Sequence, residues 1–82
     1  ENNVRVYPNP AHESVMLYLD HAYSSSINVH ITNSLGMVVK KVQLEEYRES
    51  FQLRTGDLSD GVYFISFQSA GHKVTKRLVI KH

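Results

Sequence analysis

The stretch from residue 58 to residue 68, LSDGVYFISFQ, decides the fold of this chain. It opens with Asp60-Gly61, a pair typical of turns, and continues with a two-residue period. Successive side chains of a β-strand point to opposite faces of a sheet, so this period predicts a strand. Residues 62–67 are largely apolar on both parities, as expected of a central strand covered on both faces or of one beside an edge-to-core transition. Tyr63, Ile65 and Phe67 alternate with Phe64, Ser66 and Gln68.

The same two-residue period recurs in six further segments, and a sustained helical period is hard to find. Turn residues separate the segments. Pro8-Asn9-Pro10 cannot continue a strand ladder, whereas Asn33–Gly36 and Ala70-Gly71 supply residues that tolerate a positive φ. Short strands joined by such turns predict an all-β fold, an antiparallel β-sandwich of about seven strands of the immunoglobulin-like or Greek-key type. The six segments are 4–7, 15–19, 27–31, 37–44, 51–53 and 74–80.

The length and composition limit the class of protein. A chain of 82 residues is long enough for one domain with one modest core. The absence of Cys excludes a disulfide framework, a thiolate zinc site and a Cys nucleophile, and the absence of both Trp and Cys argues against a true immunoglobulin domain. The chain begins at Glu1 without an initiating Met or a leader, so we expect residues 1–82 to be a single domain from a larger protein.

The charge is distributed unevenly along the chain. Residues 1–72 contain five basic and eight acidic residues, a balance of −3. Residues 73–82 contain four basic residues and no acid. A strand that carries Lys residues is one way in which proteins protect a sheet edge against unwanted pairing, so this pattern is compatible with edge protection and equally with recognition. The four cations are Lys73, Lys76, Arg77 and Lys81.

No constellation typical of catalysis or of a cofactor is found. None of the five His residues (12, 21, 30, 72 and 82) has a second ligand at a helical or strand spacing. Asp57 and Asp60 lack the further acids of a calcium loop, so we interpret them as turn formers whose side chains bond nearby backbone N–H groups. Gly-rich phosphate loops and nucleophile elbows are absent, and the tyrosines are scattered rather than gathered near the cations. We therefore expect no cofactor, no metal, no catalysis, no small-molecule substrate and no nucleic acid.

Four short motifs, taken in order, resemble the type A C-terminal sorting domains of type IX secretion. The first is Val6-Tyr7-Pro8-Asn9-Pro10, the second is the turn at Asn33–Gly36 with the Val-rich run after it, the third is the Leu58-x-x-Gly61-x-Tyr63 sequence, and the fourth runs from Gly71 through Lys76 and Leu78–Lys81. Asn33 stands where that family commonly has Asp, and His82 adds one residue after Lys81. The recognition residues that this resemblance implies are Tyr7, Pro8, Asn9, Pro10, Gly36, Leu58, Gly61, Tyr63 and Gly71.

The resemblance implies a role in protein transport. Such a domain would lie at the end of a larger exported cargo, which crosses the inner membrane by an N-terminal signal and passes through the periplasm. The outer-membrane type IX translocon would read the domain. A sortase-like peptidase at the cell surface would then remove it by a cut upstream of Val4, and the cargo would be anchored to lipopolysaccharide or secreted.

The uneven charge of the chain points to the last strand as the surface that such a translocon would read. An exposed edge strand can be recognised by β-augmentation, in which main-chain hydrogen bonds give affinity and alternate side chains give specificity. Lys73, Thr75, Arg77 and Val79 would form one face of the edge, and Lys76 and Lys81 would attract an acidic partner. The predicted docking strand is Lys73, Thr75, Lys76, Arg77, Leu78, Val79, Ile80 and Lys81.

Two other functions remain open at this point. One is an accessory carbohydrate- or protein-binding sandwich of a secreted enzyme, which would need a row of exposed aromatic residues or a calcium cluster on one sheet. Only Tyr18 and Tyr23 are candidates, and neither has an aromatic partner on the same face two residues away. The other is a homodimerisation module in which two copies pair their edge strands.

Overall fold

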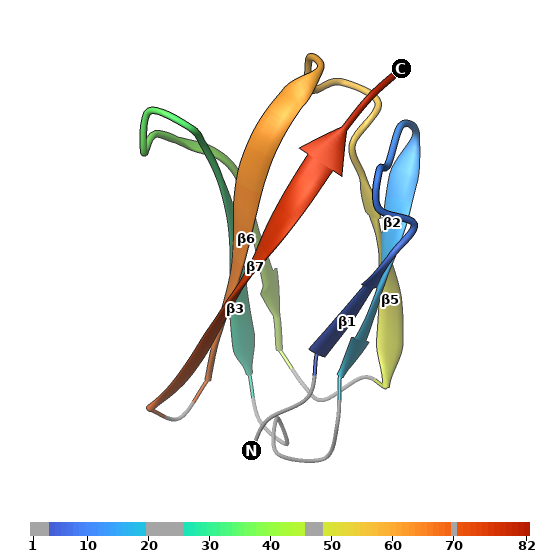
Figure 1. The fold of residues 1–82 in the computed structure, drawn as a ribbon. Coiled ribbons are helices and arrows are strands. Elements are labelled where there is room, and N and C mark those ends of the chain that lie inside the picture. The colour runs from blue at the N-terminus through green and yellow to red at the C-terminus, as the bar shows by residue number, and fades with distance from the viewer. Residues whose placement is uncertain (1–3, 20–25, 46–48, 70) are drawn as a thin grey trace.

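The computed structural model describes residues 4–19, 26–45, 49–69 and 71–82, and their regular structure consists of strands in two facing sheets (Figure 1). The predicted all-β sandwich of about seven strands is confirmed. None of the described residues belongs to a helix that could cross a membrane. The strands are β1 (Val4–Tyr7), β2 (Ser14–Leu19), β3 (Ile27–Asn33), β4 (Val38–Leu44), β5 (Ser50–Arg54), β6 (Gly61–Ser69) and β7 (His72–Ile80).

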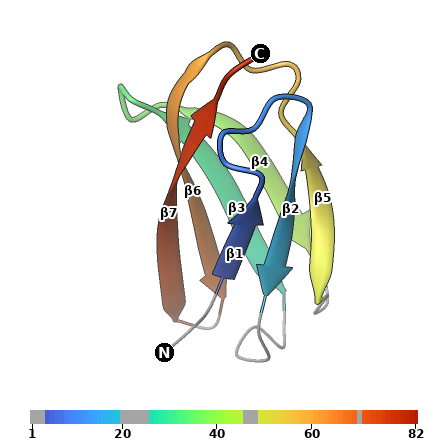
Figure 2. The ribbon, with the colours of Figure 1, turned by 45° about the vertical axis from the view of Figure 1, so that its right-hand side comes forward.

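Both sheets are antiparallel, with the strand orders β1-β2-β5 and β4-β3-β6-β7. β6 pairs with β3 on one side and β7 on the other, so its predicted central position is confirmed. The alternative of a strand covered on both faces is wrong, because no described segment covers the outer face of β6, where Phe64 is 38% exposed. Figure 2 shows the two edge strands β1 and β7 lying on the same side of the sandwich.

The core lies between the sheets and is built from one parity of each strand. In β6 the buried residues are Tyr63, Ile65 and Phe67, the parity that the alternation indicates. Burial of one large apolar side chain contributes about 1.5–3 kcal/mol, so this layer supplies most of the stability. The buried apolar side chains are Val4, Ala11, Val15, Leu17, Leu19, Ile27, Val29, Ile31, Phe51, Leu53, Tyr63, Ile65, Phe67, Leu78 and Ile80.

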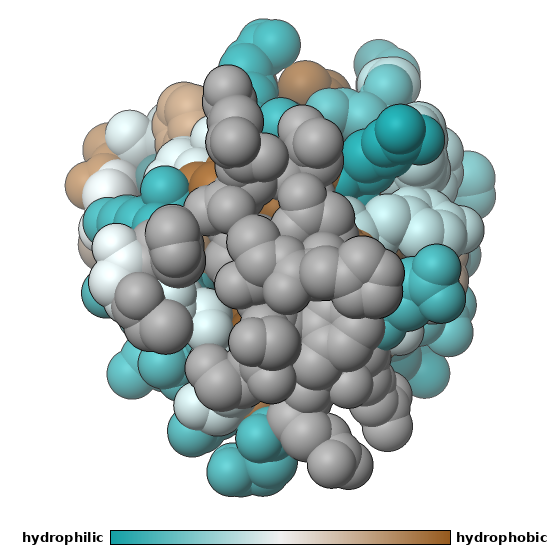
Figure 3. Space-filling model, turned by 90° about the horizontal axis from the view of Figure 1, so that it is seen from below, coloured by the Kyte–Doolittle hydropathy of each residue, from teal (hydrophilic) through white to brown (hydrophobic). Residues whose placement is uncertain are grey.

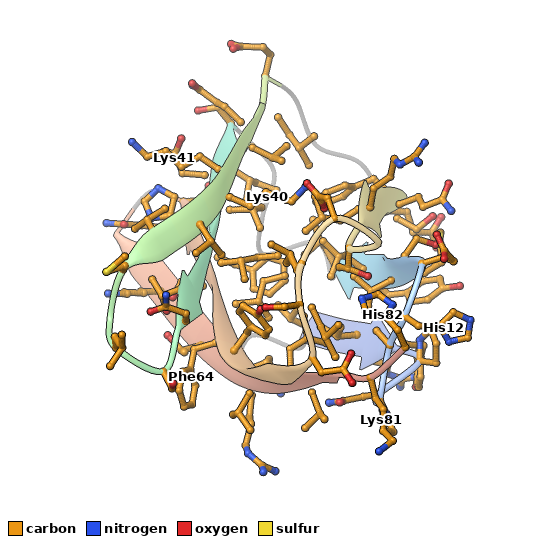
Figure 4. The ribbon with its side chains drawn as sticks, turned by 90° about the horizontal axis from the view of Figure 1, so that it is seen from above. His12, Lys40, Lys41, Phe64, Lys81 and His82 are labelled. Carbon is orange, nitrogen blue, oxygen red and sulfur yellow. The ribbon has the colours of Figure 1, made fainter. Side chains whose placement is uncertain are left out.

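A bulge in β4 turns one cation toward the gap between the sheets. Ile31 pairs with Lys40 but Thr32 pairs with Val38, so one extra residue is inserted in β4. Lys40 Nζ reaches the loop between β5 and β6, where it lies 3.0 Å from Asp57 Oδ2. Figure 4 shows Lys40 pointing toward that loop and Lys41 pointing away from the molecule. The hydrogen bond from Lys40 is the main cause that holds the pKa of the Asp57 carboxyl below its ordinary value of 3.8.

The turn between β3 and β4 is closed by the side chain of Asn33. Asn33 Oδ1 accepts hydrogen bonds from the backbone N–H groups of Leu35 and Met37, both at 3.0 Å. Gly36 has a φ of +86°, a conformation that a residue with a Cβ rarely adopts. Gly71, which precedes β7, has a φ of +85°. Both predicted turns are therefore confirmed.

Candidate docking site at the terminal strand

β7 is an edge strand, and its cations belong to a pattern that all four edges share. Each edge strand carries at least one Lys or Arg, whereas the central strands β2, β3 and β6 carry none. This distribution is how proteins protect sheet edges, so the charge of β7 alone does not distinguish recognition from protection. The sequence could not reveal the pattern, because it does not say which strands are edges. The edge cations are Arg5 in β1, Lys40 and Lys41 in β4, Arg54 in β5, and Lys73, Lys76 and Arg77 in β7.

The side chain of Asn9 binds the backbone of β7 as a neighbouring strand would. Asn9 Nδ2 donates to the carbonyl of Arg77 at 3.0 Å, and Asn9 Oδ1 accepts from the N–H of Val79 at 3.0 Å. A side-chain amide has one donor group and one acceptor, as a peptide unit has, so it satisfies two edge groups together. The prolines on either side of Asn9 follow cis peptide bonds, Tyr7–Pro8 and Asn9–Pro10.

Ala11 extends this contact by a parallel bridge to Ile80. Its N–H donates to the carbonyl of Val79 at 2.8 Å, and its carbonyl accepts from the N–H of Lys81 at 2.8 Å. Ala11 is fully buried, so the bridge is shielded from water. The connection between β1 and β2 therefore occupies the outer edge of β7 from Arg77 to Lys81.

The loop before β6 holds the end of the chain. Asp60 Oδ1 accepts from the backbone N–H of His82 at 3.0 Å, and His82 Nε2 lies 2.6 Å from the carbonyl of Leu58. The expectation that Asp60 bonds nearby backbone is thus wrong, because its partner lies 22 residues away in the chain. Tyr63 supports the same loop by donating its hydroxyl hydrogen to the carbonyl of Ser59 at 2.7 Å, as in the tyrosine corner of immunoglobulin-like sandwiches.

The first half of the β7 edge, in contrast, is not occupied by any of the described residues. In a strand the N–H and C=O groups of every second residue point to the same side. The groups of residues 77, 79 and 81 that bind Asn9 and Ala11 therefore point away from β6. The pairing of β6 and β7 has no register shift, so the backbone groups of Lys73 and Thr75 point the same way. Among the described residues these groups have no hydrogen-bond partner.

A groove between β1 and β7 lies at Lys76 and Arg77, where the open half of the edge meets the occupied half. It has a volume of about 270 Å³, and its lining contains three cations and no acid. Its apolar residues are Val4 and Val6, from the edge strand of the other sheet. The groove could therefore receive an extended, acidic chain. The lining residues are Val4, Arg5, Val6, Tyr7, Asn9, Lys76 and Arg77.

The structure brings most of the predicted recognition residues to the last strand. Tyr7 and Asn9 lie in the groove, Leu58 contacts His82, and Gly61 and Tyr63 pair with Ile80 and Leu78 in β7. Gly36 lies apart from them, in the turn between β3 and β4. Within the predicted docking strand, Leu78 and Ile80 are buried and Val79 and Lys81 are already bonded through their backbones. Only Lys73, Thr75 and Lys76 lie in the open half, and Arg77, whose carbonyl already binds Asn9, borders it.

An aromatic contact between β1 and β2 could not be predicted from the sequence. Tyr7 and Tyr18 form an edge-to-face pair with ring centroids 5.8 Å apart, although neither has an aromatic neighbour two residues away. They lie on adjacent strands, and this pairing follows from the register of β1 and β2. Tyr23 and His21 lie outside the described residues. Within the described part of the chain no three His, Asp or Glu side chains gather in a way that could hold a metal ion.

The comparisons with known proteins identify the family. Residues 5–81 match the family of secretion system C-terminal sorting domains, so the match covers β2 to β7 completely and all but the first residue of β1. A search of curated proteins found no match. The match includes the segment around Asn9, the loop at Leu58–Gly61 and β7, the three parts that the structure joins. The chain belongs to the family of secretion system C-terminal sorting domains, which direct proteins to type IX export across the outer membrane.

Proposed function

We propose that this chain is the non-catalytic C-terminal domain of a larger exported protein, and that the translocon reads it by adding a strand to the open half of β7. The observation that carries the proposal is the division of the β7 edge. Asn9 and Ala11 hold the edge from Arg77 to Lys81, while the backbone groups of Lys73 and Thr75 have no partner among the described residues. The folded domain thus presents a short, positioned piece of open sheet edge.

Backbone and charge would contribute differently to this docking. Each main-chain hydrogen bond to a partner strand contributes about 0.5–1.5 kcal/mol. Lys73, Lys76 and Arg77 would mainly raise the rate at which an acidic partner associates. Leu78 and Ile80 serve the core, since both are buried. The docking site is therefore narrower than the whole terminal strand.

A reporter protein fused in front of this domain tests the proposal. The fusion should reach the cell surface or the medium of a bacterium with a type IX system, and it should remain in the periplasm of the same strain without the translocon. Deletion of residues 76–82 should also abolish export, because it removes half of β7. Export of the deleted fusion at the wild-type level would refute the role of the terminal strand.

We also propose that a sortase-like peptidase removes the domain at the cell surface by a cut upstream of Val4. The support is the family membership and the position of β1 as the first strand among the described residues. Mass spectrometry of the exported reporter should find a new C-terminus before Val4. A reporter that reaches the surface with the sorting domain still attached would contradict this step without affecting the sorting role.

One observation supports the alternative of a carbohydrate-binding module. Tyr7 and Tyr18 are 50% and 40% exposed and lie on one sheet face. Their rings meet at 65°, however, so they do not form the flat platform on which a sugar ring stacks. Retention of the domain by insoluble polysaccharide, lost in Tyr18→Ala, would favour this alternative.

Pairing of two copies through the open half of β7 is a further possibility with a simple test. Two antiparallel β7 strands would bring Lys73, Lys76 and Arg77 of both copies close together, and like charges on paired strands are destabilising. We therefore expect light scattering to give the mass of a monomer at physiological salt. A dimer that Thr75→Pro dissociates would show that copies of this chain occupy the edge.

A further inference from the structure

The turn between β3 and β4 lies on an apolar part of the surface. Five of the seven exposed large hydrophobic side chains of the described residues gather there, so they form a patch rather than a scatter. Val38 and Phe64 both pair with Thr32, one from each side, and the turn residues follow at the end of β3. Figure 4 shows Phe64 on the outer side of the sheet near this turn. The apolar outer patch consists of Leu35, Met37, Val38, Val39 and Phe64.

The patch is held in a fixed conformation although it contributes little to the core. Asn33 closes the turn, because its side-chain oxygen accepts two backbone hydrogen bonds and its own backbone bonds with Gly36 and Met37. Leu35 is nevertheless 82% exposed and Met37 58% exposed. This is also the one family motif that does not contact β7. Because the backbone of this turn is already ordered, little conformational entropy would be lost if a partner bound to it.

The charges around the patch indicate what kind of partner fits. β3, β4, β6 and β7 contain no acidic residue. Arg77 pairs with Phe64, and Lys41 pairs with His30 on the same face. Beside the patch lies a shallow depression of about 320 Å³, lined by Asn28, His30, Lys41, Val42 and Gln43. At the end of the sandwich opposite the turn between β3 and β4, the described residues that can be seen are mostly hydrophilic (Figure 3).

We propose that the apolar outer patch is a second docking surface, which binds a protein of the export machinery through an apolar recess bordered by carboxylates. The inference rests on the proposed function, since it takes the partner from the same machinery. A second copy of this chain does not fit, because its own face would set Lys41 and Arg77 against cations. The patch faces a different side of the sheet from the β7 edge, so both surfaces can be occupied together.

A unique thiol tests this proposal, because the chain contains no Cys. The reporter fusion would carry Leu35→Cys, labelled with a thiol-linked photocrosslinker, and would be incubated with outer membranes that contain the type IX translocon. The matched control is Gln52→Cys, an exposed position on β5 in the other sheet. We expect crosslinking to a translocon protein to be at least about tenfold stronger from position 35 than from position 52, because position 35 would lie inside the interface and position 52 outside it.

Three results would overturn the inference. The first is equal crosslinking from both positions, and the second is equal crosslinking in membranes that lack the translocon. The third is binding of the fusion to protein-free phosphatidylglycerol vesicles at the level seen with translocon-containing membranes, which would make the ligand an anionic lipid surface.

Export of the same fusions separates this inference from the proposed function. The double variant Leu35→Ser/Met37→Gln should melt at the wild-type temperature, because both side chains are exposed, and should be exported several-fold less. Normal export of this variant would defeat the second surface alone. Failure of the wild-type fusion to be exported would instead defeat the proposed function.

Discussion

Asn9 is the residue on which the terminal strand depends most. Its side chain satisfies the carbonyl of Arg77 and the N–H of Val79, and it does so across 68 and 70 residues of sequence. The sequence indicates only a turn at Pro8-Asn9-Pro10, since no local pattern tells which distant backbone an amide will bind. The family motif therefore has a physical role inside the domain, that of positioning β7.

Substitution of Asn9 should loosen β7 while the rest of the sandwich keeps its structure. Asn9→Ala removes two hydrogen bonds, so we expect a loss of about 1–3 kcal/mol in the free energy of unfolding. Hydrogen exchange of the Val79 amide should accelerate more than that of the core amide of Ile65. The exchange rate of the Val79 amide in Asn9→Asp should lie between the rates in the wild type and in Asn9→Ala, because a carboxylate can accept from the N–H of Val79 but cannot donate to the carbonyl of Arg77. Asn28→Ala, at an exposed strand position, is the control; unchanged exchange at Val79 in Asn9→Ala would disprove the clamp.

Tyr63 offers a second test at a single residue. Tyr63→Phe keeps the buried ring and removes the hydroxyl that donates to the carbonyl of Ser59. We expect a loss of about 1 kcal/mol in urea unfolding, because one nearly buried hydrogen bond disappears without a cavity. Tyr18→Phe, on the exposed face of β2, should change stability much less. Equal effects of the two substitutions would show that the bond to Ser59 carries no stability.

Between elements, the pair of Lys40 and Asp57 makes stability depend on pH. The pKa of Asp57 is lowered in the folded state, chiefly by the hydrogen bond from Lys40. Its contribution is therefore complete above the ordinary pKa of 3.8 and is lost as pH falls through the lowered folded value. Melting temperatures measured from about pH 5 to about pH 2, which brackets the ordinary pKa of Asp57, should fall less steeply in Lys40→Met than in the wild type. Parallel curves would mean that the pair is not linked to folding.

The alternation of apolar residues predicts the strands, and the turn chemistry predicts the breaks at Asn33–Gly36 and Gly71. These features are local, so the sequence contains them directly. The division into sheets of three and four strands, the bulge opposite Ile31 and the bridge of Ala11 to Ile80 depend on contacts between distant segments. The same limit applies to the docking site, because the open and occupied halves of β7 differ only through Asn9 and Ala11.

In the whole molecule, the segment after β1 and the loop before β6 meet at the last strand. Asn9 and Ala11 hold its outer edge, and Asp60 accepts a hydrogen bond from the backbone of His82, two residues beyond it. β7 can therefore take its native position only when distant parts of the domain have folded. A translocon that reads the open half of β7 would in this way recognise the folded domain rather than a linear tail.

The most direct test of this account is the exported fraction of a reporter fusion that carries Thr75→Pro. The N–H of Thr75 points away from β6, so proline removes a donor at the open edge and leaves the β6 ladder intact. Gln52→Pro is the matched control. The N–H of Thr55 and the carbonyl of Glu49 bind on the β2 side of β5, so the N–H of Gln52, which has the opposite parity, points to the outer edge of β5. With both variants folded, we predict that Thr75→Pro loses export and Gln52→Pro keeps it. Wild-type export of the Thr75→Pro fusion would contradict the central claim.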